Sequence, residues 1–168
     1  YQSTKYALCL PCLAGRRAPS LPRRQAGTYH LSPIQHHHAH IASCMAENGL
    51  INQRVIGVAF DGTGWGEDNT FWGGEFLLAD YQDAKRVAHL REIALPGGEM
   101  AIRQPWRLAA AWLDKIYGES FLKLPIGLVK KIKRKNWQLL RQICQKGYNS
   151  PLTSSMGRLF DALGSLIL

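Results

Sequence analysis

The sequence predicts an α/β fold, and two observations support this. A histidine-rich helical segment is followed by short, apolar, β-branched runs, and most of the remaining chain has helical spacing of apolar residues. Of the 168 residues 46% are apolar, which is enough for a core and excludes a disordered chain. No apolar run approaches the ~20 residues of a membrane span. There is no secretory signal, so we expect a cytoplasmic protein without a membrane partner.

The ends of the sequence suggest a piece of a longer protein. The chain starts at Tyr1 rather than at a methionine. Its last residues, FDALGSLIL, have an apolar helical pattern that no cap or stop signal ends. We therefore expect an incomplete fold unit.

The first predicted helix covers residues 35–48. Ser32 is placed as its N-cap, Pro33 as its first residue and Gln35 three residues after the cap, and Gly49 is placed to end it. Residues 36–40 read HHHAH, so four of the six histidines fall within this stretch. Positions i and i+4 share one face of a helix, so His36 and His40 are predicted to point the same way.

This histidine pair is suited to a metal. Neutral imidazole is the commonest protein metal ligand, and two on one helix face form a bidentate grip. The pattern is not that of a zinc peptidase, because His37 stands where HExxH has its glutamate. The alternative is a set of hydrogen-bonded histidines without metal. Four imidazoles beside an acidic loop favour the metal, with Asp61 as the third ligand.

A predicted hairpin follows the helix. Residues 55–60, VIGVAF, and 71–79, FWGGEFLLA, read as strands, and residues 85–93 as a third. Between the first two, DGTGWGEDN carries glycines at 62, 64 and 66, which predict a tight turn whose amides approach an anion, with Thr63 adding a hydroxyl. Phosphate-binding hairpins of actin-like ATPases begin in this way. An ordinary glycine-rich hairpin is the alternative.

Three further helices are predicted in the second half of the chain. The first covers residues 105–117 and opens with Pro105, and the second covers residues 136–145. The third runs from Met156 to the end and is capped by Ser154 and Ser155.

The net charge of +9 comes from local clusters. One lies in the Arg/Pro-rich stretch 15–27, which is predicted to be a loop, and the other lies in residues 123–141. Nucleic acid or an acidic partner is one interpretation, and a solvated surface is the other. We favour the solvated surface, because no aromatic RNA-binding motif or Cys/His finger accompanies the charge. The single CxxC of Cys9 and Cys12 is taken as incidental, with reduced thiols.

Several long motifs resemble the HypF family of carbamoyltransferases, which mature [NiFe] hydrogenases. They are QHHHAHIASCMAENGL, VIGVAFDGTGWGEDNTFWGGEFLLADY, RVAHLREIALPGGEMAIRQPWRLA and NSPLTSSMGRLFDAL, in this order. The opening YQSTKYA also resembles the family, whereas residues 9–32 and 123–145 match it least.

The resemblance implies an incomplete lobe of an actin-like ATPase (ASKHA, ribonuclease H-like) fold, similar to the threonylcarbamoyltransferases (TsaD-like) that modify tRNA. Residues 1–32 would then be a poorly matched N-terminal segment and 33–168 a partial TsaD-like carbamoyl-transfer domain. It also implies a second half beyond Leu168 with another metal-ligating aspartate. Further modules would make carbamoyl-adenylate from carbamoyl phosphate and ATP.

For the site, the resemblance implies a divalent metal, zinc or iron, on His36, His40 and Asp61. We expect Asp61 and Thr63 to serve catalysis, Asp61 as a metal ligand and Thr63 through its hydroxyl in the turn that matches the region near the adenylate phosphate. The residues expected at the nucleotide are Gly62, Gly64, Gly66, Gly157 and Asp161, the last two in a segment with Ser154 and Ser155 that resembles GEAFD of the tRNA enzymes.

The function implied is transfer of the carbamoyl group from carbamoyl-adenylate to the C-terminal cysteine thiol of the partner HypE. The resulting thiocarbamate supplies the cyanide ligands of the hydrogenase iron. Two alternatives are open on the sequence alone: an inactive truncated fragment that only binds metal or partner, and a zinc-dependent RNA-binding module.

Overall fold

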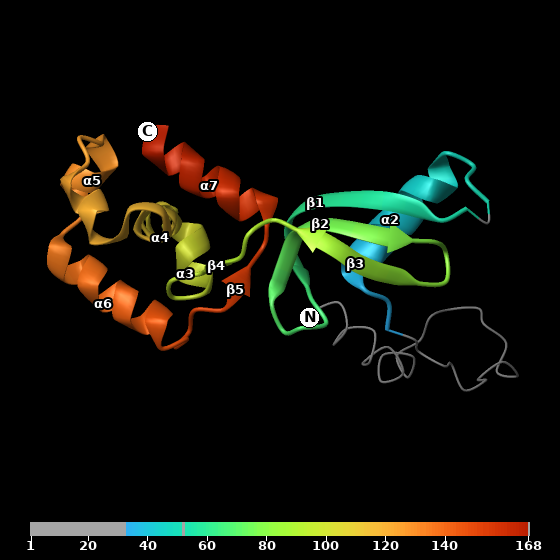
Figure 1. Ribbon diagram of the computed structural model, residues 1–168, viewed down its shortest axis with the longest axis horizontal. Helices are drawn as coiled ribbons and strands as arrows, with labels where there is room; N and C mark the ends of the chain where they lie inside the picture. Colours follow the sequence, from blue (N-terminus) through green and yellow to red (C-terminus); the bar gives the residue numbers. More distant parts are fainter. Residues whose placement is uncertain (1–32, 52, 168) are drawn as a thin grey trace, which may run out of the picture. The chain divides into compact units, whose positions relative to one another are not determined.

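The computed structural model describes residues 33–51 and 53–167 and has the mixed α/β fold that the sequence predicts (Figure 1). The chain divides into two units, residues 1–34 and 35–168, and all of the described helices and strands belong to the second unit. The expectations for the Arg/Pro-rich loop 15–27, for Cys9 and Cys12 and for the Ser32 cap lie outside the described residues.

Helix α2 (His36–Glu47) crosses one face of an antiparallel hairpin formed by β1 (Val55–Trp65) and β2 (Phe71–Ala79) (Figure 1). Strand β3 (Ala84–His89) pairs antiparallel with β2. The helix buries its apolar side chains here because glycine and alanine at the strand surface let it approach closely. The small core between helix and strands consists of Ile41, Met45, Ala59, Trp72, Leu77 and Ala79.

The helix runs from His36 to Glu47, so the predicted helix 35–48 is confirmed to within one residue at each end. Pro33, predicted as its first position, lies before the helix, and that part of the prediction is wrong. Gln35 is its N-cap: the backbone is extended there (φ −62°, ψ 133°), and the side chain accepts a hydrogen bond from the amide of His38. A glutamine can reach the first-turn amide as the shorter cap residues do. Gly49 follows the helix with φ 65°, as the sequence predicts.

The glycine segment after Asp61 is strand rather than the predicted turn. Strand β1 continues to Trp65, and the chain turns later, where the Gly66 amide donates to Thr70 O at 2.9 Å. Phe60 pairs with Gly74 and Gly64 with Trp72, so residues 61–63 stand opposite Gly73 alone. Such a bulge bends a strand and redirects its side chains. Glycines permit it where a regular strand would have continued.

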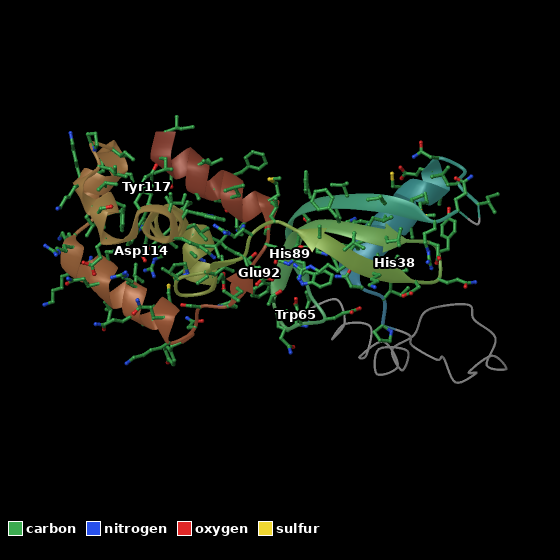
Figure 2. The ribbon with its side chains drawn as sticks, in the orientation of Figure 1. His38, Trp65, His89, Glu92, Asp114 and Tyr117 are labelled. Atoms are coloured by element: carbon green, nitrogen blue, oxygen red, sulfur yellow. The ribbon has the colours of Figure 1, made fainter. Side chains whose placement is uncertain are left out.

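The second half is mostly helical. Helix α4 (Trp106–Tyr117) packs on α7 (Met156–Ile167), next to α3 (Glu99–Arg103), the 3₁₀ helix η1 (Gly118–Lys123), α5 (Gly127–Lys131) and α6 (Arg134–Gln145). On α4, Asp114 (labelled in Figure 2) pairs with Arg141 of α6 at 3.1 Å. The buried side chains of this larger core are Ile93, Leu95, Ala101, Leu108, Ala109, Ala110, Ala111, Leu113, Phe121, Val129, Trp137, Leu140 and Ala162.

The sheet joins the two halves. Strand β5 (Leu152–Thr153) runs parallel to β2 through the pair Phe71–Thr153, and β4 (Ile93–Ala94) pairs antiparallel with β5. The predicted strand 85–93 is therefore two elements, β3 and β4, separated by an irregular stretch. The three helices predicted for this half are confirmed, with ends shifted by at most two residues. None of the helices among residues 33–51 and 53–167 is long and apolar enough to span a bilayer.

Candidate metal centre

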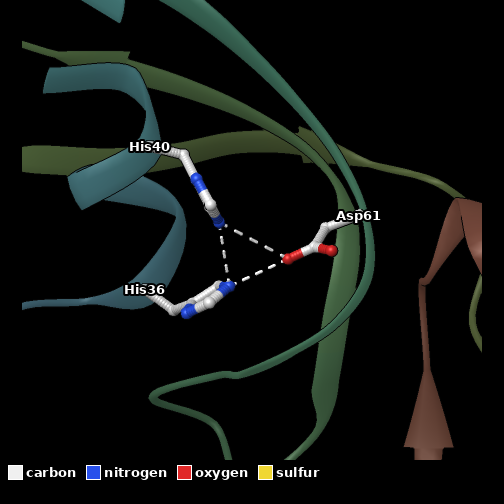
Figure 3. Close-up of side chains that lie close together, drawn as sticks. All are labelled: His36, His40 and Asp61. Carbon is white, nitrogen blue, oxygen red and sulfur yellow. Dashed lines mark hydrogen bonds and ion pairs between the residues drawn. The ribbon is translucent and has the colours of Figure 1, made fainter. Parts of the chain in front are cut away.

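Three side chains from α2 and β1 bring one ligand atom each to a common point (Figure 3). His36 Nε2 lies 2.8 Å from Asp61 Oδ2 and 3.1 Å from His40 Nε2. His40 Nε2 lies 3.6 Å from Asp61 Oδ2. We call these three residues the His–His–Asp cluster.

The cluster arises from two local features. One helical turn separates His36 from His40, which stacks their rings edge to face with centroids 4.6 Å apart. Asp61 is the first residue of the β1 bulge, where the strand departs from its regular pairing. The predicted histidine spacing and the unpredicted bulge together place a carboxylate opposite two imidazoles.

The three ligand atoms fit a divalent metal. Zinc bonds nitrogen and oxygen at about 2.1 Å, so ligand atoms at tetrahedral angles lie roughly 3.4 Å apart. The observed separations of 2.8, 3.1 and 3.6 Å differ from that by roughly 0.2 to 0.6 Å, which small side-chain movements can accommodate. A single proton on an imidazole nitrogen satisfies only one of these contacts, whereas a cation at the centre would satisfy all three. Histidine and carboxylate suit zinc and ferrous iron alike.

The cluster is open to solvent on one side. The side chains of His36 and His40 are 43% and 58% exposed and that of Asp61 is 32% exposed. Burial alone would raise the pKa of the Asp61 carboxyl, but hydrogen bonds with His36 and the Gly62 amide hold that pKa below its ordinary value. A carboxylate that stays ionised and a site with an open side are what a catalytic metal centre needs.

The second histidine of the motif, His37, points into the protein and is fully buried. Its ring packs over Gly64: a β-carbon on Gly64 would lie 2.7 Å from His36 Cδ2 and closer still to His37 Cε1. Gly64 is therefore required for the helix to approach the strand at the cluster. Burial and the neighbouring His36 lower the pKa of His37.

Helix α7 holds the bulge from the other side. The Ser155 hydroxyl lies 2.8 Å from both Asp61 O and Gly62 O, and it accepts from the Arg158 amide at 3.3 Å as the predicted helix cap. A β-carbon on Gly157 would lie 2.8 Å from Gly62 Cα. Of the residues predicted for the nucleotide, Gly62 and Gly157 are thus brought into contact.

A buried glutamate organises the strand behind the bulge. Glu75 on β2 has no exposed side-chain surface, and its carboxylate accepts from the amides of Gly73 and Gly74, from the Ser154 hydroxyl and from Arg86 Nε at 2.6 Å. This network fixes Gly73, which faces the bulge, and Ser154, which precedes Ser155. The sequence prediction did not include Glu75, although a lone acid within an apolar strand was a usable signal.

Three predicted residues stand apart from the cluster. Thr63 is exposed, and no contact among the described residues joins its hydroxyl to the cluster. Gly66 packs against Trp72 in the turn after the strand. Asp161 forms an ion pair with Arg158 at 3.1 Å, one turn along α7. The amides of Gly62 and Gly66 are hydrogen-bonded to Asp61 Oδ1 and Thr70 O, so these two do not form the predicted anion cradle.

Comparison with known proteins identifies the family. Residues 57–168 match the family described as the carbamoyltransferase Kae1-like domain, second subdomain, and residues 1–47 match the HypF Kae1-like domain. The chain belongs to the carbamoyltransferase Kae1-like domain family. The resemblance predicted from the motifs is confirmed.

The curated relatives of the chain are named as carbamoyltransferases of the HypF type. The chain is 44% identical over 147 residues to carbamoyltransferase HypF of Synechocystis sp., covering 80% of this chain and 19% of that protein. It is 44% identical over 136 residues to carbamoyltransferase HypF2 of Cupriavidus necator, covering 80% of this chain and 16% of that protein. The chain therefore spans about a fifth of the length of these relatives.

Solved structures agree with the fold. A crystal structure of full-length HypF in a phosphate- and nucleotide-bound form matches with a TM-score of 0.74 at 40% identity, over 85% of this chain and 18% of that one. HypF of T. kodakarensis matches with a TM-score of 0.64, also at 40% identity, over 79% of this chain and 18% of that one.

Proposed function

We propose that this chain forms the metal-binding part of a carbamoyl-transfer site that acts during [NiFe] hydrogenase maturation. The carbamoyl group would pass from carbamoyl-adenylate to the C-terminal cysteine thiol of a HypE-like partner, and the thiocarbamate would later yield a cyanide ligand. The observation that carries this proposal is the convergence of His36, His40 and Asp61 in a chain of the carbamoyltransferase Kae1-like domain family.

The fold proposed for the complete domain is actin-like, with this chain as one wall of the cleft. The antiparallel β1–β2–β3 hairpin system, followed by a helical segment that returns to the sheet through β5, supports this assignment. Since the chain spans 16–19% of its relatives, we propose that ATP and carbamoyl phosphate are handled by other parts of a longer polypeptide. We propose the cytoplasm as the compartment, where thiols such as those of Cys44 and Cys144 stay reduced.

The cluster residues have distinct parts in the proposed transfer. His36, His40 and Asp61 would hold zinc or ferrous iron, which as a Lewis acid would polarise the carbamoyl carbonyl. Ser155 and Gly157 keep the bulge in place, so that the Asp61 carboxylate stays opposite the imidazoles. The partner's thiolate attacks the carbonyl carbon, a C–S bond forms, the C–O bond to the adenylate phosphate breaks, and AMP leaves with the electron pair.

The test is transfer to a defined acceptor. The complete polypeptide that carries this chain is incubated with ATP, carbamoyl phosphate and a HypE-like partner, and the partner is analysed by intact-mass spectrometry. We expect one carbamoyl group on the C-terminal cysteine of the partner. A partner with that cysteine changed to serine is the matched control and stays unmodified.

Two results would contradict the proposal. Wild-type protein that forms carbamoyl-adenylate but leaves the thiol unmodified would indicate an inert binding segment instead. Equal transfer by an Asp61→Asn variant would show that the cluster is not the transfer site.

A further inference from the structure

His37 has a buried ring nitrogen without a partner. The side chain is 0% exposed, and Nε2 has no hydrogen-bond partner among the residues that the structure describes. This nitrogen faces the His–His–Asp cluster, because Asp61 Oδ2 lies 4.0 Å from it. That separation is too long for a hydrogen bond. Buried polar atoms are normally paired, so an unpaired one at the edge of a candidate site indicates a missing partner.

The chemical identity of this nitrogen follows from Gln35. The Gln35 Oε1 atom accepts from the His38 amide at 2.9 Å, and its Nε2 atom lies 3.2 Å from the carbonyl oxygen of Trp65. An amide N–H can only donate and a carbonyl can only accept, so these two contacts fix the orientation of the side-chain amide. The Gln35 Nε2 atom, a donor, then lies 3.3 Å from His37 Nδ1.

This contact determines the tautomer of His37. Since Gln35 Nε2 donates, His37 Nδ1 must present its lone pair. A neutral imidazole with a bare Nδ1 carries its proton on Nε2. The ring itself is fixed, since it stacks on Trp72 with centroids 6.2 Å apart and lies against the bare face of Gly64. The atom that faces the cluster is therefore an N–H donor held in one direction.

A donor of this kind is what the carbamoyl carbonyl requires. During attack by a thiolate, that oxygen gains negative charge, and fixed donors in a water-poor site stabilise it. The amides of Gly62 and Gly66 are already hydrogen-bonded within the chain. His37 Nε2–H is a buried side-chain donor without a hydrogen-bond partner among the described residues, and it lies 4.0 Å from Asp61 Oδ2.

We propose that His37 donates a hydrogen bond from Nε2 to the carbonyl oxygen of the carbamoyl group, and that Gln35 is the positioning residue that sets this tautomer. This inference rests on the proposed function and adds a residue to it. Because the donor is neutral and buried, it stabilises charge that appears during transfer without requiring a charged partner in the resting site. The Nε2 atoms of His36 and His40 already contact Asp61 Oδ2, so, unlike His37 Nε2, they are not free to donate to a substrate.

The tautomer is measured first, because it does not depend on any substrate. Protein with ¹⁵N-labelled histidine is studied by long-range ¹H–¹⁵N correlation spectra, with His37 assigned by its absence in His37→Gln. We expect His37 as the Nε2–H tautomer in the wild type. In Gln35→Glu a carboxylate faces Nδ1, which should move the proton to Nδ1 while the helix cap is kept. If the wild-type His37 ring carries its proton on Nδ1, the inference is overturned, regardless of the result of the transfer assay.

Ligand binding is measured next, on the complete polypeptide loaded with metal. The probes are the carbamoylmethylphosphonate ester of adenosine, which has the carbonyl but cannot transfer it, and the methylphosphonate ester, which lacks the carbamoyl group. We expect His37→Leu and Gln35→Glu to weaken the first probe by about tenfold and the second hardly at all. His37→Gln, which keeps an N–H near the same place, should retain most of the affinity. Equal loss for both probes overturns the inference and indicates a merely structural role.

Transfer kinetics separate this inference from the proposed function. We expect His37→Leu to lower kcat by ~10²–10³ with metal content unchanged, as for loss of an oxyanion donor. His38→Gln is the control, because His38 (Figure 2) lies on the same helix and contacts Asp80 O at 2.7 Å, away from the cluster. Wild-type protein without transfer would contradict the proposed function. Wild-type transfer that His37→Leu leaves intact would overturn the His37 inference alone.

Discussion

The hydroxyl of Ser155 lies 2.8 Å from the backbone carbonyl oxygen of Asp61, a residue 94 positions earlier in the chain. The same hydroxyl lies 2.8 Å from Gly62 O and caps α7 by accepting from the Arg158 amide. One side chain thus joins the start of the last helix to the bulge that presents the metal-binding carboxylate. Stability of the helical half and geometry of the cluster are coupled through it.

Removing this hydroxyl should affect both properties. We expect Ser155→Ala to lower the free energy of unfolding by about 1–2 kcal/mol, through loss of a cap and of a buried hydrogen bond. It should also weaken metal binding by ~10-fold, as supporting residues of metal sites do. Denaturant unfolding and a competitive zinc titration measure the two effects. Ser150→Ala is the control, since Ser150 is also buried and donates to Tyr148 O at 3.0 Å, away from the cluster. A Ser155→Ala protein with unchanged metal affinity would refute the coupling.

Alanine substitutions at two glycines of α7 should change the stability of the protein in opposite directions. A β-carbon on Gly157 would lie 2.8 Å from Gly62 Cα, so Gly157→Ala must displace backbone and should destabilise the protein by about 1–3 kcal/mol. Gly164 has nothing within 4 Å of the same position, so Gly164→Ala should stabilise the helix by roughly 0.5–1 kcal/mol. Unfolding curves of the two variants are compared. Equal effects would mean that the contact between Gly157 and Gly62 does not constrain the fold.

The regular elements were predicted well because their sequence patterns are local. The β-branched run at 55–60, the Pro105 start of α4 and the serine cap of α7 are each determined by neighbours within a few residues. The three short helices and β5 were not predicted. They have five or six residues at most, and tertiary packing rather than periodicity stabilises them.

For the site, the ligand residues were predictable but the backbone between them was not. The spacing of His36 and His40 predicts a shared face, and the structure places Asp61 beside it. The glycines after Asp61 predicted a turn, because glycine frees the backbone without saying which conformation it takes. The segment forms a bulged strand because Phe60 pairs with Gly74 and Gly64 with Trp72. These pairings are contacts across the hairpin, which the local sequence pattern does not reveal. The roles of His37, Ser155 and Glu75 also depend on contacts across the fold.

Glu75 should make stability depend on pH. Burial alone would raise the pKa of its carboxyl, but hydrogen bonds from Arg86, Ser154 and the amides of Gly73 and Gly74 lower it below the ordinary value of 4.5. Above that ordinary value the carboxyl is ionised in both the folded and unfolded states, and its full stabilisation is present. As pH falls below it, the unfolded state binds the proton first, and the stabilisation declines until the folded carboxyl is protonated as well.

Glu75→Gln tests this dependence. Near pH 7 the variant should be less stable by about 3 kcal/mol, because Arg86 loses its buried partner. The difference from wild type should shrink as pH falls below about 4.5, and it is measured by urea unfolding at a series of pH values. Glu99→Gln is the control: Glu99 pairs with Arg103 on the surface, and its loss should cost well under 1 kcal/mol at any pH. A Glu75→Gln difference that stays constant down to pH 3 would refute the depressed pKa.

The metal assignment is tested by elemental analysis of the purified protein after gel filtration. We expect about one zinc or iron per chain, since three ligand atoms converge on one point and leave room for one ion. The double variant His36→Ala/His40→Ala should contain none, and Asp61→Asn should bind on the order of 100-fold more weakly, because an amide oxygen is a poorer ligand than a carboxylate.

His89→Ala is the control, since the His89 ring contacts only the Leu90 carbonyl among the described residues. If the double variant keeps its metal, the ion is held elsewhere, and the close contacts among His36, His40 and Asp61 are hydrogen bonds and an ion pair without a metal. If instead the double variant loses the metal and His89→Ala keeps it, the ion is bound at the His–His–Asp cluster. Two features then build this centre: the four-residue histidine spacing on α2 and the bulge of β1.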